Sequence, residues 1–373
     1  MKRRIVLVLG PQRDALSGVS THLNHLFASR LAEAYPLVHF QVGSEGRNES
    51  VAGRLWRVLA SPFRLGAAIL ARDAALVHLN TSLNARAFWR DLVYLLVAKV
   101  CGARVVYQVH GGALPQEFFD GERFLAPLLK GLLRLPDAIV VLARAELDAY
   151  RRFVPGQQVL ALPNGIACAA PARPAAASSD SAAPLRLAYI GRLVREKGLY
   201  ETLLGLRLAL TEGTAATLVI SGSGTEERAL RDYAAQLDIA DAVEFTGPVN
   251  GTRKAELLAA SDVLVLASHA EGLPYALLEG MAAGTAPIAT HVGAIPDVVT
   301  QGVHGLLVAP RDANAICRAI TTLAADRELL QRMSNAGRMR IATAYSIERL
   351  ADDFCRLYAA LCAPGPAGEL TGL

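Results

Sequence analysis

The chain has 373 residues, of which 52% are hydrophobic and 19% are charged, with a formal net charge of +4. This composition excludes a disordered or fibrous protein, and the length favours two domains, because single hydrophobic cores stop growing at smaller sizes. Residues 1–165 carry 20 Lys and Arg against 12 Asp and Glu, a net +8, and the remainder carries 18 against 22, a net −4. A basic first half suits an anionic membrane surface or substrate, but ordinary solvated arginine explains it equally well.

Short β-branched runs alternate with helical patterns from the first residues onward. The runs RIVLVLG, LVHFQVG, ALVHLN, RVVYQVHG and DAIVVLA predict buried parallel strands. Between them, Ser20–Ala34 and Trp89–Val100 have the apolar spacing of helices. This is the βαβ pattern of an open α/β domain, which we place at residues 1–165. The first run is short and no cleavage site follows, so it predicts a strand and not a signal peptide.

The composition changes after this domain. Residues 166–184 are mostly Ala, Pro, Ser and Arg, which predicts an interdomain linker. The strand pattern then restarts with LRLAYIG and continues through GLLVAP, which predicts a second α/β domain at 185–345. A final helix is expected at Ile347–Leu361, with Ser346 as its N-cap. The five cysteines lack metal-ligand spacing, which favours a reduced, cytoplasmic protein.

Ligands of open parallel sheets bind beyond the carboxyl ends of the strands, so the residues after each strand are the candidates for chemistry. In GRLVREKG, Arg192 and Lys197 follow a buried strand, between two glycines that allow close backbone approach. Two cations there suit a diphosphate and a departing anion. The alternative is structural, with both cations paired to Glu196 and Glu201.

Two residues of the first domain also follow strands. Gly18 lies near the start of a helix, where backbone amides bind phosphate favourably. His110 ends a strand before Gly-Gly, where an imidazole could contact a reacting sugar. A lone histidine is as often structural. Neither GxGxxG nor a Walker A loop is present, so no nicotinamide, flavin or nucleoside triphosphate site is indicated.

The segment SHAEGLPYALLE carries two acids at a strand-to-helix turn. We expect Glu271 on the loop and Glu279 about one turn inside the following helix. Carboxylates accept paired hydrogen bonds from vicinal hydroxyls, as in ribose recognition. A solvated helix face explains Glu279 poorly, because it is the only charge in residues 273–283.

Taken together, these residues show that the chain resembles the retaining, family 4 (group 1) nucleotide-sugar glycosyltransferases. The resemblance covers nearly the full length and is most specific from Ala188 to Val308, where YIGRLVREKG, SGSG, FTGPV, the E-x7-E element and GVHGLLV fall in the family's order. It implies the GT-B fold, an α/β fold with two Rossmann-like domains facing across a cleft. It also implies that the final helix, within residues 346–373, returns to the first domain.

The resemblance also implies roles for residues. Arg192 and Lys197 would bind the donor diphosphate, and Glu271 would hold donor-sugar hydroxyls. Glu279 would bind the ribose, and Gly18 would offer an amide to the diphosphate. Backbone amides near Gly272, Leu273 and Pro274 would surround the sugar, and the base would lie against Gly247–Val249. His110 would lie near the anomeric carbon and the acceptor.

The expected reaction is hexose transfer, with retention, from a UDP- or GDP-linked sugar to a glycan or polyprenyl-diphosphate-linked acceptor in polysaccharide biosynthesis. No metal, other cofactor or nucleic acid is expected. Arg54–Arg72 is basic and amphipathic, with Trp56 and Phe63, which suggests peripheral binding to the anionic inner membrane leaflet; an ordinary packed surface helix is the alternative. A GT-B epimerase and a non-catalytic nucleotide-sugar-binding subunit are the alternative functions.

Overall fold

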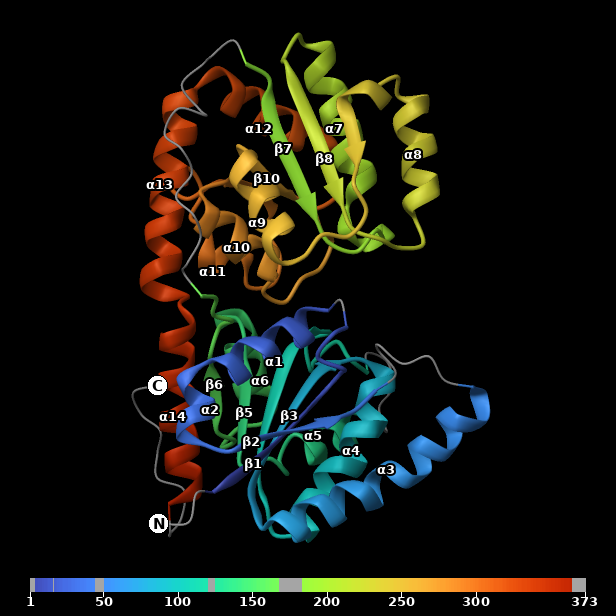
Figure 1. Ribbon diagram of the computed structural model, residues 1–373, viewed down its shortest axis with the longest axis vertical. Coiled ribbons are helices and arrows are strands. Elements are labelled where there is room, and N and C mark those ends of the chain that lie inside the picture. The colour runs from blue at the N-terminus through green and yellow to red at the C-terminus, as the bar shows by residue number, and fades with distance from the viewer. Residues whose placement is uncertain (1–3, 16, 44–49, 120–124, 168–182, 364–373) are drawn as a thin grey trace. The chain divides into compact units, whose positions relative to one another are not determined.

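The computed structural model describes residues 4–15, 17–43, 50–119, 125–167 and 183–363 (Figure 1). The chain divides into two compact units, the first made of Met1–Gly165 with Ile347–Leu373 and the second of Ile166–Ser346. The predicted linker at 166–184 lies largely outside the described residues. Each unit is an α/β domain with one six-stranded sheet, as the strand and helix patterns predicted.

Unit 1 contains a parallel sheet with the strand order β2-β1-β3-β4-β5-β6. Its strands are β1 (Ile5–Gly10), β2 (Leu37–Gln41), β3 (Ala74–Leu83), β4 (Arg104–Gly112), β5 (Ala138–Val141) and β6 (Val159–Ala161). The chain runs from β1 outward to β2 and then returns to β3 on the other side of β1. The strand order therefore reverses between β1 and β3, which is where sheets of this kind bind ligands.

Helices cover both faces of this sheet. They are α1 (Gly18–Ala28), α2 (Arg30–Ala34), α3 (Val51–Arg72), α4 (Ala85–Val100), α5 (Leu125–Leu132), α6 (Arg144–Phe153) and α14 (Ile347–Cys362). Alternate strand residues point to opposite faces, so Leu7 and Val77 belong to the core under α3–α6, whereas Val8 and Leu76 belong to the core under α1, α2 and α14.

The last helix completes unit 1. Phe354, Leu357 and Tyr358 of α14 are fully buried against the strands of the first sheet. The Tyr358 hydroxyl also lies 2.6 Å from Nδ1 of His78 in β3. The fold of unit 1 thus depends on a segment that follows unit 2 in the sequence.

Unit 2 has the strand order β12-β11-β10-β7-β8-β9, again with every pairing parallel. Its strands are β7 (Leu185–Ile190), β8 (Ala216–Ser221), β9 (Val243–Phe245), β10 (Val263–Leu266), β11 (Ala286–Thr290) and β12 (Leu306–Val308). Its α-helices are α7 (Leu199–Thr211), α8 (Glu227–Gln236), α9 (Gly251–Ala260), α10 (Tyr275–Ala283), α11 (Ile295–Val298), α12 (Ala313–Ala325) and α13 (Arg327–Ala344). Here the order reverses between β7 and β10.

One predicted helix needs correction. Ser20–Ala34 was expected to be continuous, but the helix breaks at Ser29, whose backbone is extended. The Ser29 hydroxyl donates to Leu26 O and accepts from Leu31 N, so this residue ends α1 and begins α2. Serine competes for backbone hydrogen bonds in this way, and apolar spacing alone does not reveal it.

Candidate functional site

The reversal of strand order in unit 2 brings together two loops that the sequence separates by about 75 residues. One loop follows β7 and carries Arg192 and Lys197; the other follows β10 and carries Glu271. Gly198 closes the first loop in a left-handed conformation, with φ of 66°. A Cβ on Gly198 would lie 1.9 Å from Ala267 O, so only glycine lets the two loops approach this closely.

A lysine and a glutamate meet where these loops converge. Lys197 Nζ lies 2.5 Å from Glu271 Oε1, and the Ser268 hydroxyl donates to the same oxygen at 2.7 Å. Both charged side chains are largely buried, at 19% and 11% exposure. Lys197 therefore does not pair with Glu196 or Glu201, the alternative that the sequence left open. Glu201 instead contacts His269 at 3.1 Å. The geometry yields a preoriented cation and carboxylate.

Arg192 differs from Lys197. The Tyr189 hydroxyl donates to Arg192 O at 2.7 Å and holds the loop backbone. The Arg192 side chain is exposed, and it forms no hydrogen bond or ion pair with another residue in the described ranges. Its guanidinium is therefore available for an anion in solution.

The turn after Glu271 is held by a third loop. Ala294 N donates to Gly272 O at 2.9 Å. Gly293 has φ of 56°, and a Cβ there would lie 1.9 Å from Glu271 O. Leu273 is buried and Pro274 is the N-cap residue of α10. Sequence reasoning did not single out Gly293, although a glycine between a strand and a helix is a usable signal.

The second acid has a partner that sequence reasoning missed. Glu279 lies in α10, and Lys254 Nζ of α9 lies 2.6 Å from its Oε1. Burial raises the pKa of Glu279, while Lys254 acts in the opposite direction. A largely buried carboxylate requires a countercharge, so the isolated Glu279 was a signal that such a cation exists, but its position was not predictable.

The loop predicted to contact the base precedes α9. Gly222 N and the Ser221 hydroxyl both donate to Gly247 O, at 3.0 Å and 2.8 Å, which ties this loop to the end of β8. Val249 is partly buried and lies two residues before α9, the helix that carries Lys254. The loop and the Lys254–Glu279 pair are therefore structurally connected.

In unit 1, Gly18 is the first residue of α1. Ser17 caps the helix by accepting a hydrogen bond from Ser20 N at 3.2 Å. Gly18 is exposed, and no atom lies within 4 Å of the position that a Cβ would occupy. This leaves open space at the helix N-terminus, beside the reversal of strand order between β1 and β3.

His110 at the end of β4 is held in one tautomer. Asn80 Nδ2 donates to Leu9 O at 3.1 Å, which turns Asn80 Oδ1 towards His110 Nε2 at 2.8 Å. A carbonyl oxygen can only accept, so Nε2 carries the proton. Burial, and secondarily His78, lower the pKa of His110 to about 3. The ring is therefore neutral at physiological pH, with an unprotonated Nδ1 that accepts hydrogen bonds.

Asn80 is a functional candidate that sequence reasoning missed, because it is the last residue of the predicted strand ALVHLN and does not follow it. Its neighbour in β3, His78, forms a buried chain with Tyr358 and Gln108, and burial lowers the His78 pKa to about 4. His22 of α1 packs edge-to-face on His110, with ring centroids 4.6 Å apart. His22, His78 and His110, each with a pKa lowered by burial, therefore lie together beneath the end of β4.

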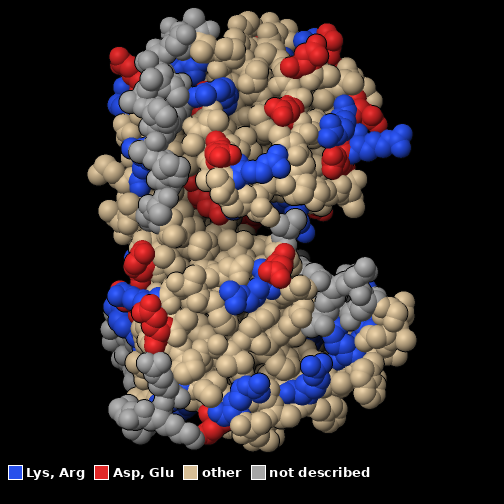
Figure 2. Space-filling view, viewed as in Figure 1, with Lys and Arg blue, Asp and Glu red and all other residues tan. Residues whose placement is uncertain are grey.

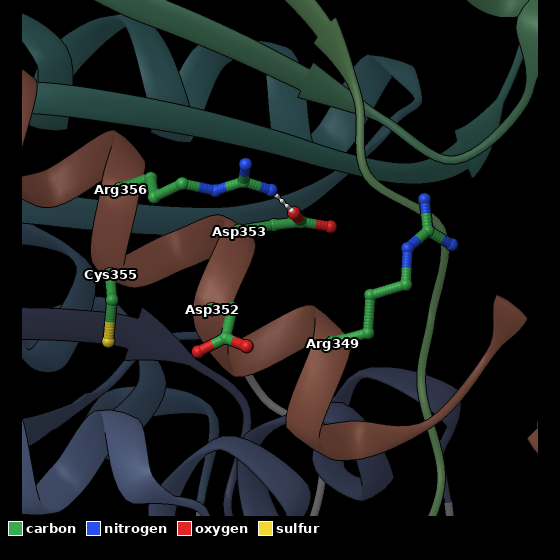
Figure 3. A pocket seen from close by; sticks show the side chains of 5 residues that line it. All are labelled: Arg349, Asp352, Asp353, Cys355 and Arg356. Atoms are coloured by element: carbon green, nitrogen blue, oxygen red, sulfur yellow. Dashed lines mark hydrogen bonds and ion pairs between the residues drawn. The ribbon is translucent and has the colours of Figure 1, made fainter. Parts of the chain in front are cut away.

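A surface pocket on unit 1 does not qualify as a functional site. Figure 3 shows its five lining side chains, all from α14: Arg349, Asp352, Asp353, Cys355 and Arg356. Asp353 accepts a hydrogen bond from Arg356, and Asp352 pairs with Arg30 of α2. Because both carboxylates have a cation partner, this is a salt-bridged helix surface.

Across the residues that the structure describes, no three side chains of His, Cys, Asp or Glu gather closely enough to hold a metal ion. None of the described helices combines the length and the apolar character that crossing a bilayer requires.

Comparison with known proteins identifies the class and then the family. The chain superposes on the sucrose-phosphate synthase of Thermosynechococcus elongatus with a TM-score of 0.78 and 21% identity, covering 96% of this chain and 99% of that one. For Anabaena HepE in complex with UDP-glucose the TM-score is 0.72 with 17% identity, covering 95% and 99%. At these identities the likeness shows the fold, which is the GT-B fold of glycosyltransferases.

Sequence comparison supplies the family. Residues 8–165 match the Glycosyl transferase 4-like domain, and residues 178–340 match Glycosyl transferases group 1. The glycogen synthase of Mycobacterium tuberculosis is 30% identical over 231 residues, which are 61% of this chain and 55% of that protein. The matched region therefore spans about half the length of this relative. The chain belongs to the family 4, group 1 glycosyltransferases.

Proposed function

We propose that this protein is a hexosyltransferase that moves a sugar, with retention of configuration, from a nucleoside diphosphate to a glycan or polyprenyl-diphosphate-linked acceptor in polysaccharide biosynthesis. The observation that carries the proposal is the Lys197–Glu271–Ser268 cluster where the strand order of unit 2 reverses. The HepE complex with UDP-glucose supports a nucleotide-sugar donor, and the relation to a glycogen synthase supports a glycan acceptor.

The donor would be bound by both kinds of charge. Arg192 and Lys197 would neutralise the diphosphate, as exposed and preoriented cations respectively. Glu271 keeps Oε2 available for donor-sugar hydroxyls while Oε1 is held by Lys197 and Ser268. The amides near Gly272, Leu273 and Pro274 would surround the sugar. Four further contacts complete the proposal: Glu279 to the ribose, Lys254 to Glu279, Val249 to the base and Gly18 to the diphosphate.

Catalysis would rest on stabilising the leaving group. As the nucleoside diphosphate departs, Lys197 and Arg192 would bind its growing negative charge. The acceptor hydroxyl would attack from the face that the phosphate leaves, and a phosphate oxygen would take its proton. His110 is neutral, so it is not a general acid; its Nδ1 would accept a hydrogen bond from a sugar hydroxyl and orient it.

The proposal includes a metal-independent reaction in the cytoplasm. The sequence lacks a DxD element after a strand, and two basic residues already lie in the loop after β7. These cations would perform the charge neutralisation that a divalent metal performs in other glycosyltransferases. Activity retained in excess EDTA is the expected outcome.

A donor screen tests the function. UDP-, GDP- and ADP-sugars are added separately to the full chain, and the melting temperature is recorded, because a ligand bound only to the folded state raises it. The stabilising donor is then incubated with glycan and lipid-linked acceptors, and the anomeric configuration of the product is determined by NMR. An inverted product contradicts retention. Interconversion of the donor sugar alone indicates an epimerase, and binding without turnover a non-catalytic subunit.

A further inference from the structure

Exposed large hydrophobic side chains are concentrated on two neighbouring helices of unit 1. Of the thirteen such side chains among the described residues, seven lie on α3 and four on α4. The α3 residues are Val51, Leu55, Trp56, Val58, Leu59, Phe63 and Leu70, with exposures from 55% to 84%. Contiguous apolar surface of this kind marks an interaction site.

The N-terminal half of α3 has little packing against the described part of the protein. No residue from Val51 to Ala60 is buried, on any side of the helix. The C-terminal half is anchored by Ser61, Leu65 and Ile69. Figure 1 shows this N-terminal half extending away from the sheet of unit 1. The N-terminal half, which exposes Trp and Leu to water over nearly three turns, gains little stability from packing within its own unit.

The charge on α3 has one sign. The helix contains Arg54, Arg57, Arg64 and Arg72 and no Asp or Glu. Figure 2 shows Lys and Arg side chains along the region of α3. Trp56, Leu59, Phe63 and Leu70 are spaced by three, four and seven residues, so they share one side of the helix. Arg57 and Arg64 are one heptad apart and lie beside that apolar side.

The neighbouring helix extends the apolar surface. Trp89, Val93, Leu96 and Val100 of α4 are spaced by four, three and four residues and are 41% to 87% exposed. They form one stripe along the helix. The two helices are in contact, because a Cβ on Gly66 of α3 would lie 3.5 Å from Val97 Cγ1 of α4. We call the exposed apolar residues of α3 and α4, with the four arginines of α3, the α3–α4 surface.

We propose that the α3–α4 surface docks this protein on an anionic lipid bilayer, with α3 lying in the plane of the headgroups. Trp and Phe side chains insert at the boundary of the acyl chains, and the arginines contact lipid phosphates. The inference deepens the proposed function, since docking would bring the enzyme to a polyprenyl-linked acceptor. It stands on the surface itself and does not require the transfer reaction.

The structure favours a bilayer over a protein partner. A protein groove covers one side of a helix, whereas eight of residues 51–60 are exposed and only Arg57 and Ala60 are partly covered. Pairing with a second copy would bring four arginines of one α3 against four of another with no acid between them, which is unfavourable. Anionic headgroups complement that charge.

Co-sedimentation with vesicles tests the proposal. The full chain is mixed with vesicles of phosphatidylcholine alone, or of equal parts phosphatidylcholine and phosphatidylglycerol. We expect binding to the anionic vesicles that weakens as salt is added. The double variant W56S/F63S and the triple variant R54E/R57E/R64E should each lower the partition coefficient by about tenfold or more. Met339→Ser is the matched control, since Met339 is 70% exposed but lies in unit 2.

Each outcome is decisive. Unchanged vesicle binding of both variants overturns the proposal. A loss of vesicle binding in Met339→Ser as large as in these variants also overturns it. Equal binding to both vesicle types refutes the role of the arginines. A protein that does not bind vesicles, but that forms a dimer by light scattering which W56S/F63S abolishes, would assign the surface to a second copy of the chain. Donor-induced thermal shifts should be the same in all variants, so failed docking and failed donor binding are separate results.

Discussion

The two units offer a ligand different chemistry at corresponding places in their sheets. In unit 2, each candidate carboxylate is held by a lysine: Glu271 by Lys197 and Glu279 by Lys254. In unit 1, the candidate groups are uncharged: the N-terminus of α1 at Gly18, and His110, whose pKa is lowered to about 3. Among these candidate groups, charge is maintained in unit 2 by pairing, whereas burial keeps His110 of unit 1 uncharged.

This difference indicates a division of labour. Charged pairs are suited to a charged ligand, because they bind phosphate and orient carboxylates without leaving an isolated buried ion. In unit 1, the neutral imidazole of His110 is suited to the hydroxyls of a sugar, and the amides at the N-terminus of α1 are suited to a phosphate. The following variants test this comparison, beginning with the largest expected effect.

Breaking the Lys197–Glu271 pair should affect the reaction most. We expect Lys197→Met and Glu271→Ala each to lower kcat/KM by about 10²–10³, the usual loss when one preorganised electrostatic contact to a developing charge is removed. Because the two side chains touch, the double variant should lose less than the product of the single losses. Steady-state kinetics measure kcat/KM for the single and double variants. Arg332→Ala is the control, because it breaks an exposed ion pair with Glu328. Wild-type activity of Glu271→Ala would refute the site.

Changing Asn80 tests whether the neutrality of His110 matters. Asn80→Ala removes the acceptor that keeps the proton on His110 Nε2. We expect kcat to fall by about tenfold, the usual loss when one contact that orients a substrate is removed. Asn80→Asp places a carboxylate beside the ring, which raises the pKa of His110. The kcat of Asn80→Asp should then decrease as pH falls towards 5, while the wild-type profile shows no step from His110. Identical pH profiles would show that Asn80 only supports the fold.

The second pair should control binding more than turnover. Glu279→Gln removes the charge but keeps the shape, and we expect KM for the donor to rise about tenfold, as for one lost charge-assisted hydrogen bond, with little change in kcat. Lys254→Met removes the group that opposes the burial of Glu279, so the Glu279 pKa rises further. Its KM should therefore increase as pH decreases. A lower kcat at unchanged KM would instead place Glu279 in the transition state.

The last prediction concerns stability and not activity. His78 has a folded pKa of about 4, below the ordinary 6.5, so the unfolded chain binds more protons between these values. The stability from neutral His78 is complete above pH 6.5 and is lost as pH falls towards 4. Between pH 7 and 5 this costs about 2 kcal/mol. The free energy of unfolding, measured with urea at pH 7 and at pH 5, should show that loss. In His78→Gln the free energy of unfolding should depend less on pH. The same pH dependence in the variant would contradict the prediction.

The sequence predicted the fold class correctly, because buried parallel strands leave runs that local patterns reveal. It also singled out Glu271 and Glu279, since charges are rare in an apolar segment. It did not reveal Lys254 or Asn80. Lys254 lies 25 residues before Glu279 on another helix, and Asn80 is 30 residues before His110 on another strand. No local spacing relates such pairs.

What the sequence determined by itself was therefore the set of elements and the chemical groups at strand ends, since both follow from local hydrophobic pattern and residue type. The partners were decided only by the tertiary structure: which lysine holds which carboxylate, and which nitrogen of His110 carries the proton. These depend on strand order and on the close approach of loops at Gly198 and Gly293. Burial then sets the charge of each group, because removal from water is a property of the folded chain.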